Sequence, residues 1–149
     1  NIQGDEPFIN PEQINQLSAC FKDDKTDIAT LIKKIDSEGE LFNPNRPKVA
    51  VDENSFATMF SRNAIPELIN IEKTEWLSTQ DFFKHIGIYG YRSTVLKKIS
   101  QLPPSPLEIK ERLEQLRWIE NDYKIKVAIT SFEAIAIDTP EDLEKITFK

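Results

Sequence analysis

The chain has 149 residues, a length that suits one domain of ordinary size. It is 39% hydrophobic and 30% charged with a net charge of -6, which excludes a disordered chain and predicts no whole-surface attraction to nucleic acid or anionic lipid. No run of about 18 apolar residues occurs, so the sequence predicts no membrane span. Cys20 is the only cysteine, which excludes an intrachain disulfide and is typical of a reducing compartment.

The first predicted element is a helix that begins at residues 10–13. An Asn suited to the N-cap, a Pro suited to the first helical position and a Gln able to close a capping box stand there in order. Its predicted apolar face consists of Ile14, Leu17 and Phe21. A strand is expected at residues 28–35.

A loop over residues 38–47 is expected to lead into a hairpin. Residues 48–51 and 56–60 are rich in strand formers and are separated by a polar turn. Residues 63–82 have little periodicity and predict a long, partly mobile loop of the kind that is often functional. Its possible anchors are Trp76 and Leu77.

Residues 85–91 are rich in β-formers and predict a strand, after which Ser93 is suited to cap a short helix. Residues 105–108 form a capping box with Pro at the first helical position, and we expect this helix to run to about Glu120. Its apolar face is predicted to hold Ile109, Leu113 and Leu116, with Glu108 and Arg112 as an i, i+4 pair.

Two further strands are expected at residues 124–130 and 134–137, and a last helix is expected to open at residues 139–142. Strands and helices therefore alternate, most clearly after residue 84. This order predicts an α/β fold with a largely parallel sheet and an inserted antiparallel hairpin. The sequence contains no repeat and no sign of a second domain.

Several kinds of chemistry are excluded by residue counts. With one His and one Cys, the chain is not expected to build a Cys/His zinc site. It lacks a Gly-x-Ser-x-Gly elbow, and its four glycines form neither a phosphate loop nor a dinucleotide fingerprint.

Two acids follow predicted strands. Asp5 comes after Asn1–Gly4, and Asp138 comes after the apolar run 134–137. Open α/β sheets bind ligands at the carboxyl ends of their strands, where two converging carboxylates can hold Mg²⁺. Two turn acids would give the same pattern, so both interpretations stay open at this point.

Other polar residues are weaker candidates when each is taken alone. The four-residue spacing of His85 and Tyr89 places both side chains on one face of a strand, where they could bind a sugar or a carboxylate or could simply pack together. Arg62 could bind an anion through two N–H groups, or could be an ordinary surface arginine. Glu114 and Gln115 follow on a predicted helix and signal nothing alone.

Taken together, the motifs are more specific. They occur in the order Asn1–Pro7, Phe42–Asn45 with Lys48-Val49, Phe60–Arg62, His85–Arg92, Pro104–Glu108, Leu113–Arg117 and Asp138–Leu143. This series resembles the 3-deoxy-D-manno-octulosonate cytidylyltransferases, or CMP-Kdo synthetases, from the first residue of the chain to the last.

The resemblance implies a nucleotide-diphospho-sugar-transferase-like, Rossmann-like α/β fold in a cytoplasmic homodimer. It implies transfer of CMP from CTP to 3-deoxy-D-manno-octulosonate (Kdo) with release of pyrophosphate, which activates Kdo for lipopolysaccharide synthesis. It also implies that Asp5 and Asp138 hold Mg²⁺. The residues that it implies for the Kdo site are Gln3, Arg62, His85, Tyr89, Glu114 and Gln115.

The resemblance has one departure. Members of the family carry an N-terminal strand and a Gly/Arg/Lys loop that grip the nucleotide, and nothing in this sequence corresponds to them. We therefore expect residues 1–149 to be the C-terminal part of a single cytidylyltransferase domain, without the first strands of its sheet and inactive alone. Two alternatives stay open: a cytidylyltransferase for another 2-keto acid sugar such as sialic acid, and a non-catalytic binding or dimerisation module derived from this fold.

Overall fold

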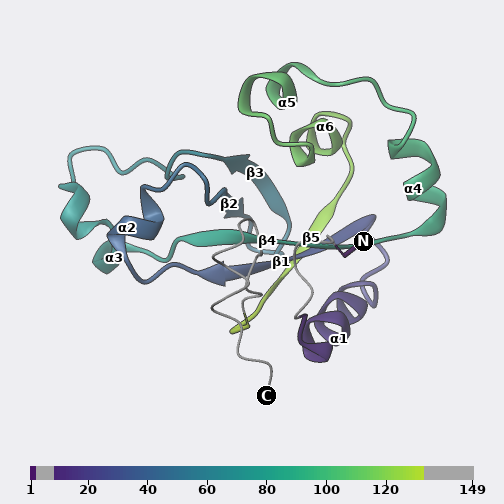
Figure 1. Cartoon of the computed structure of the whole chain (residues 1–149), viewed down its shortest axis with the longest axis horizontal. Coiled ribbons are helices and arrows are strands. Elements are labelled where there is room, and N and C mark those ends of the chain that lie inside the picture. Colours follow the sequence, from purple (N-terminus) through teal and green to yellow (C-terminus); the bar gives the residue numbers. More distant parts are fainter. Residues whose placement is uncertain (3–8, 133–149) are drawn as a thin grey trace, which may run out of the picture.

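In the described part of the chain, five strands form one mixed sheet in the order β3-β2-β4-β1-β5 (Figure 1). The computed structural model describes residues 1–2 and 9–132 of the chain. The strands are β1 (Ile28–Lys34), β2 (Lys48–Val51), β3 (Ala57–Ser61), β4 (Phe83–Tyr91) and β5 (Ile125–Ile129).

The sheet confirms the predicted α/β class and the inserted hairpin, because β2 pairs antiparallel with β3. The prediction that the sheet is largely parallel is wrong for the described strands. Among the five described strands, only β1 and β5 pair in parallel, whereas β4 runs antiparallel to both β1 and β2. The connection from β1 to β4 passes through the hairpin and not through a crossover helix, so β4 returns beside β1 in the opposite direction.

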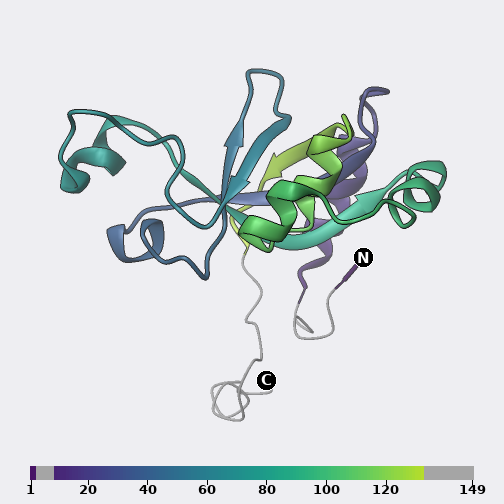
Figure 2. The same ribbon diagram turned by 90° about the horizontal axis from the view of Figure 1, so that it is seen from above.

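Helices cover both faces of this sheet. They are α1 (Pro11–Cys20), α2 (Glu38–Leu41), the 3₁₀ turn η1 (Lys73–Glu75), α3 (Trp76–Thr79), α4 (Ser93–Ile99), α5 (Pro106–Glu111) and α6 (Gln115–Glu120). In Figure 1, α1 lies on one face of the sheet and α5 and α6 lie on the other. Figures 1 and 2 both place α2 and α3 beyond one end of the sheet.

The two faces follow from the alternation of side chains along β1. Ile28 and Ile32 belong to the main core, which includes Leu116 and Trp118 of α6. Ala29, Leu31 and their neighbours pack instead in a second core with Leu17 of α1. Alternation with period two therefore divides one buried strand between two cores.

The predicted start of α1 is confirmed, whereas its predicted apolar face is partly wrong. Asn10 caps the helix, and the side chain of Gln13 accepts a hydrogen bond from the Asn10 backbone N–H at 3.1 Å. Gln13 is buried with this bond made, whereas Ile14 is 49% exposed. Leu17 is buried as predicted.

The prediction of a single helix from residue 105 to about residue 120 is wrong, because the structure contains two helices there, α5 and α6. The capping box at Ser105 is present, but Arg112 adopts the left-handed conformation at φ 56° and ends α5. Glu108 consequently pairs with Arg117 of α6 and not with Arg112. Ile109, predicted to be apolar core, is 67% exposed.

The segment at residues 63–82 is more ordered than a plain loop, since it contains η1 and α3. Trp76 is a buried anchor as predicted, and it stacks on Phe82 with a centroid distance of 5.9 Å. The predicted loop at residues 38–47 also begins with the short helix α2, which Ser37 caps. The predicted strand at 134–137 and the helix start at 139–142 lie outside the described residues.

Candidate functional site

A break in the pairing of β1 with β4 shapes the site. Thr30 is opposite Tyr89, but the next residue, Leu31, is opposite Ile86. Two residues of β4 therefore bulge out of the ladder, and bulges of this kind redirect side chains next to binding sites. The buried Thr30 hydroxyl stabilises the bulge through the carbonyls of Ile86 and Ile88, at 3.2 and 2.9 Å.

His85 lies beside this bulge. Its Nε2 is 3.0 Å from the Thr30 hydroxyl, and the ring packs edge-on to Phe60 and against Tyr89, with centroid distances of 5.4 and 5.2 Å. Burial lowers the pKa of His85 to about 4, so the imidazole is neutral near pH 7. The contact with Tyr89 confirms that the two side chains share one face of the strand.

Tyr89 joins β4 to helix α6. The side-chain amide of Gln115, the first residue of α6, donates a hydrogen bond to the Tyr89 hydroxyl. The Gln115 Oε1 atom is buried and has no hydrogen-bond partner among the described residues. Burial raises the pKa of Tyr89, so its hydroxyl keeps its proton. The pair therefore presents one O–H donor and one carbonyl acceptor at the same place.

A hollow of about 420 Å³ lies next to this pair and includes Glu114 in its lining. Its aromatic wall is Tyr91 and Trp118, and the Tyr89 ring packs against both. Asn1 also lines the hollow and exchanges backbone hydrogen bonds with Tyr89 at 2.6 and 3.1 Å. Burial, and then the negative charge of Glu114, raise the pKa of Tyr91 to about 12.

The structure thus brings three of the predicted residues together by contact, namely His85, Tyr89 and Gln115. A fourth, Glu114, precedes Gln115 in the chain and lines the neighbouring hollow. Gln3, Asp5 and Asp138 lie outside the described residues. A substrate role for these seven residues and for Arg62 stays a prediction, because the structure contains no ligand.

Arg62 has a local structural role. Its guanidinium donates hydrogen bonds to the carbonyls of Pro44, Glu111 and Arg112 at 3.1, 2.9 and 3.3 Å. The buried Lys48 ammonium in turn donates to the Arg62 carbonyl at 3.0 Å. These bonds connect the end of β3 to the end of α5 and stabilise the backbone turn at Arg112.

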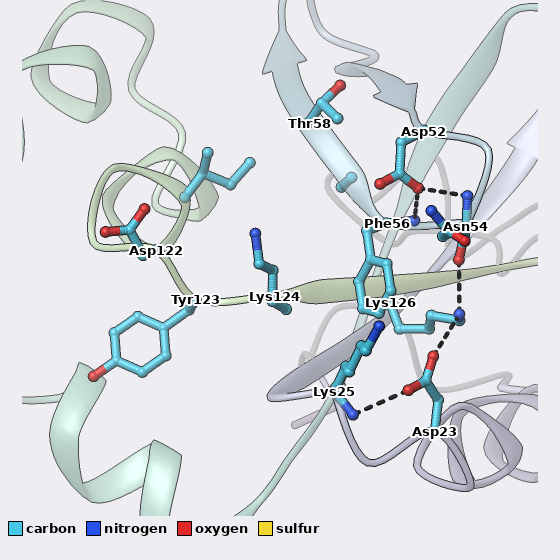
Figure 3. A pocket seen from close by; sticks show the side chains of 12 residues that line it. Asp23, Lys25, Asp52, Asn54, Phe56, Thr58, Asp122, Tyr123, Lys124 and Lys126 are labelled. Atoms are coloured by element: carbon cyan, nitrogen blue, oxygen red, sulfur yellow. Dashed lines mark hydrogen bonds and ion pairs between the residues drawn. The ribbon is translucent and has the colours of Figure 1, made fainter.

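A second hollow, of about 740 Å³, is a different place, shown in Figure 3. Lys126 there donates to Asp23 and to the Asn54 carbonyl at 2.9 and 2.7 Å, and it lies over the Phe56 ring. The hydrogen bond from Lys126 lowers the pKa of Asp23. None of the predicted site residues that the structure describes, Arg62, His85, Tyr89, Glu114 and Gln115, lines this hollow, so it is not the candidate site.

Sequence reasoning missed Thr30 and the aromatic wall. Thr30 is a polar residue inside the apolar run Ile28–Ile32, and this is a signal that could have identified it, because a buried polar group in a strand needs a partner. Tyr91 and Trp118 gave no such signal, since buried aromatic residues are common in any core.

The described part of the chain also bears on metal sites and membrane spans. Within residues 1–2 and 9–132, no group of three or more His, Cys, Asp or Glu side chains could hold a metal ion. No helix in these same residues is both long and apolar enough to span a membrane.

Comparison with known proteins identifies the class of protein. The sequence model of the family described as cytidylyltransferase matches residues 1–127, which is most of the chain. The chain therefore belongs to the cytidylyltransferase family.

The similar proteins share one more specific name. A 3-deoxy-manno-octulosonate cytidylyltransferase from Parabacteroides distasonis is 58% identical over 97% of this chain, and one from Cytophaga hutchinsonii is 54% identical over 99%. A solved CMP:2-keto-3-deoxy-manno-octonic acid synthetase in complex with CTP matches 97% of this chain at 38% identity and a TM-score of 0.86. The resemblance inferred from the motifs is confirmed, and so is the Rossmann-like mixed-sheet fold.

These matches cover only part of the relatives. The chain spans 59% of the length of the two curated relatives and 58% of the solved structure.

Proposed function

We propose that this chain carries the sugar-acid half of an enzyme that transfers CMP from CTP to Kdo and releases pyrophosphate. The family membership and the names of the similar proteins support this function. The product would be an activated Kdo for lipopolysaccharide biosynthesis.

One observation from the structure carries the proposal. Tyr89 and Gln115 meet with a donor and a buried acceptor that has no partner within residues 1–2 and 9–132, and His85 adds a neutral imidazole next to them. A sugar hydroxyl both donates and accepts, so a polyhydroxylated acid matches this set of groups. Buried polar groups left without partners also discriminate strongly against ligands that lack the matching hydroxyl.

The chemistry requires mainly positioning. The anomeric hydroxyl of Kdo would attack the α-phosphorus of CTP in line, forming a P–O bond while the bond to the pyrophosphate oxygen breaks. His85, Tyr89, Glu114 and Gln115 would bind the hydroxyls and orient the attacking oxygen. Holding two reactants in this geometry can supply a large part of the rate enhancement.

Asp5 and Asp138 would hold Mg²⁺, although both lie outside the described residues. Their carboxylate oxygens are the donor type that Mg²⁺ prefers. When bound, Mg²⁺ offsets negative charge on the triphosphate as pyrophosphate leaves.

We also propose a domain context, an oligomeric state and a cellular compartment for this chain. Residues 1–149 would form the C-terminal part of a single cytidylyltransferase domain; the coverage of 59% of a relative's length supports only that they are a part. The enzyme would act as a homodimer in the cytoplasm. Sedimentation of the full-length protein at micromolar concentration would test the dimer.

Pyrophosphate release by the full-length protein tests the function. We expect release with CTP, Mg²⁺ and Kdo, and much less when N-acetylneuraminate replaces Kdo. Faster turnover of N-acetylneuraminate would assign the protein to a sialic acid. A lack of turnover with both acids, together with no thermal stabilisation by Kdo, would leave only the non-catalytic module.

A further inference from the structure

The Thr30 hydroxyl has three hydrogen-bond partners but only one hydrogen to donate. Its oxygen lies 2.9 Å from the Ile88 carbonyl oxygen, 3.2 Å from the Ile86 carbonyl oxygen and 3.0 Å from Nε2 of His85. A hydroxyl has one hydrogen to donate and two lone pairs with which to accept. Carbonyl oxygens only accept, so the hydroxyl hydrogen must serve one of the two carbonyls.

This count determines the direction of the hydrogen bond with His85. If the Thr30 hydrogen pointed at Nε2, the lone pairs of the hydroxyl would face two carbonyl oxygens with no hydrogen between them. Since Thr30 is fully buried, no bulk water is there to relieve that contact. His85 therefore donates from Nε2–H to the Thr30 oxygen.

The ring has little freedom to change this arrangement. Phe60 packs edge-on against the imidazole, and Tyr89 packs against it from β4. A flip of the ring would exchange Nε2 for Cε1 and would lose the bond to Thr30. Because burial also keeps the imidazole neutral, a proton on Nε2 leaves Nδ1 with a lone pair. Nδ1 makes no hydrogen bond with any residue in the described ranges 1–2 and 9–132.

We propose that Thr30 is a positioning residue that holds His85 in the Nε2–H tautomer, so that Nδ1 accepts a hydrogen bond from a hydroxyl group of the bound sugar acid. The sugar part of this inference rests on the proposed function, whereas the tautomer does not. The opposite tautomer would present a donor at the same place and would suit an oxyanion of the ligand. Thr30 thus makes His85 select a hydroxyl.

The tautomer can be measured without any substrate. In the full-length protein labelled with ¹⁵N-histidine, long-range ¹H–¹⁵N correlation distinguishes the protonated ring nitrogen from the bare one, and a His85→Gln variant identifies the resonances of His85. We expect the proton on Nε2 at neutral pH. A proton on Nδ1 would overturn the proposal.

Two substitutions assign this effect to the hydroxyl of Thr30. In Thr30→Val, a methyl group replaces the acceptor, and an N–H donor buried against a methyl group is costly, so we expect the Nδ1–H form to become populated. Thr30→Ser keeps the hydroxyl and should retain the wild-type spectrum. A Thr30→Val spectrum identical to wild type would overturn the role of Thr30. If Thr30→Val does not fold, the wild-type and Thr30→Ser spectra still decide, since Nδ1–H in either contradicts the proposal.

Kinetics test the part that concerns the sugar. Loss of one oriented acceptor should raise the KM for Kdo on the order of tenfold in Thr30→Val, with the KM for CTP unchanged and Thr30→Ser within about twofold of wild type. A shifted tautomer with an unchanged KM for Kdo would overturn the hydroxyl contact while leaving the proposed function in place. Failure of wild type to use any sugar acid would overturn the proposed function, and with it the hydroxyl contact, while the tautomer measurement would still stand.

Discussion

His85 links the site to the stability of the molecule at the scale of one residue. Burial lowers its pKa to about 4 in the folded state, whereas an unperturbed histidine titrates near 6.5. Between these two values the unfolded chain binds a proton that the folded chain does not. The free energy of unfolding therefore falls as the pH is lowered from about 6.5 to about 4. Below about pH 4 the part of this fall that comes from His85 is complete.

His85→Gln should remove this pH dependence. Over the window, wild type is expected to lose on the order of 3 kcal/mol more stability than the variant, because each unit of pKa shift corresponds to about 1.4 kcal/mol. Urea unfolding of both proteins between pH 4 and pH 7 provides the measurement. Parallel pH profiles would show that His85 does not carry the lowered pKa.

At the scale of elements, sequence motifs correctly predicted those helix ends that depend on contacts between residues close in the chain. The caps at Asn10 and Ser105 were readable from sequence because each involves residues within one helical turn. The end of α5 at Arg112 was not readable. Its conformation is stabilised by hydrogen bonds from Arg62, which lies about fifty positions earlier in the chain and belongs to the end of β3. The direction of β4 depends in the same way on pairing between distant segments.

The contact of α1 with β4 gives a test at this scale. A Cβ atom added to Gly90 would lie 2.8 Å from Cε2 of Phe21, the C-cap residue that follows α1. Gly90→Ala must therefore displace the Phe21 ring, and we expect the free energy of unfolding to fall by about 1–3 kcal/mol.

Gly39 in α2 provides the matched control. A Cβ atom there would meet nothing within 4 Å, and alanine is preferred to glycine in helices. Gly39→Ala should leave stability unchanged or raise it by up to about 1 kcal/mol. Urea unfolding of the two variants compares them directly, and equal effects would contradict the packing of Phe21 on Gly90.

At the scale of the whole molecule, the candidate site is assembled from β1, β4 and α6. The four-residue spacing was enough to predict that His85 and Tyr89 share a face. Gln115 was predicted to belong to the site from the family resemblance and not from the spacing of residues in the sequence. The structure adds its hydrogen bond with Tyr89. Thr30 was not predicted as a site residue, because its hydrogen-bond partners come within reach only when β1 pairs with the bulged strand β4.

The absence of a phosphate loop from the sequence gives a prediction for the 149-residue chain by itself. Since its four glycines form no nucleotide-binding motif, we expect no pyrophosphate release from this chain with CTP, Kdo and Mg²⁺. The full-length protein is the positive control. Turnover by the 149-residue chain would mean that these residues also bind the triphosphate.

The assignment of this site to a sugar acid depends most directly on Gln115. Its side-chain amide donates a hydrogen bond to the Tyr89 hydroxyl, and its Oε1 has no partner among the described residues. The decisive measurement is steady-state pyrophosphate release by full-length Gln115→Leu and by the control Gln80→Leu, which changes the same residue type at the end of α3, beyond one end of the sheet (Figure 1). We predict a KM for Kdo raised about tenfold or more in Gln115→Leu, with the KM for CTP unchanged and Gln80→Leu like wild type. An unchanged KM for Kdo in Gln115→Leu would contradict the assignment of this site to the sugar acid.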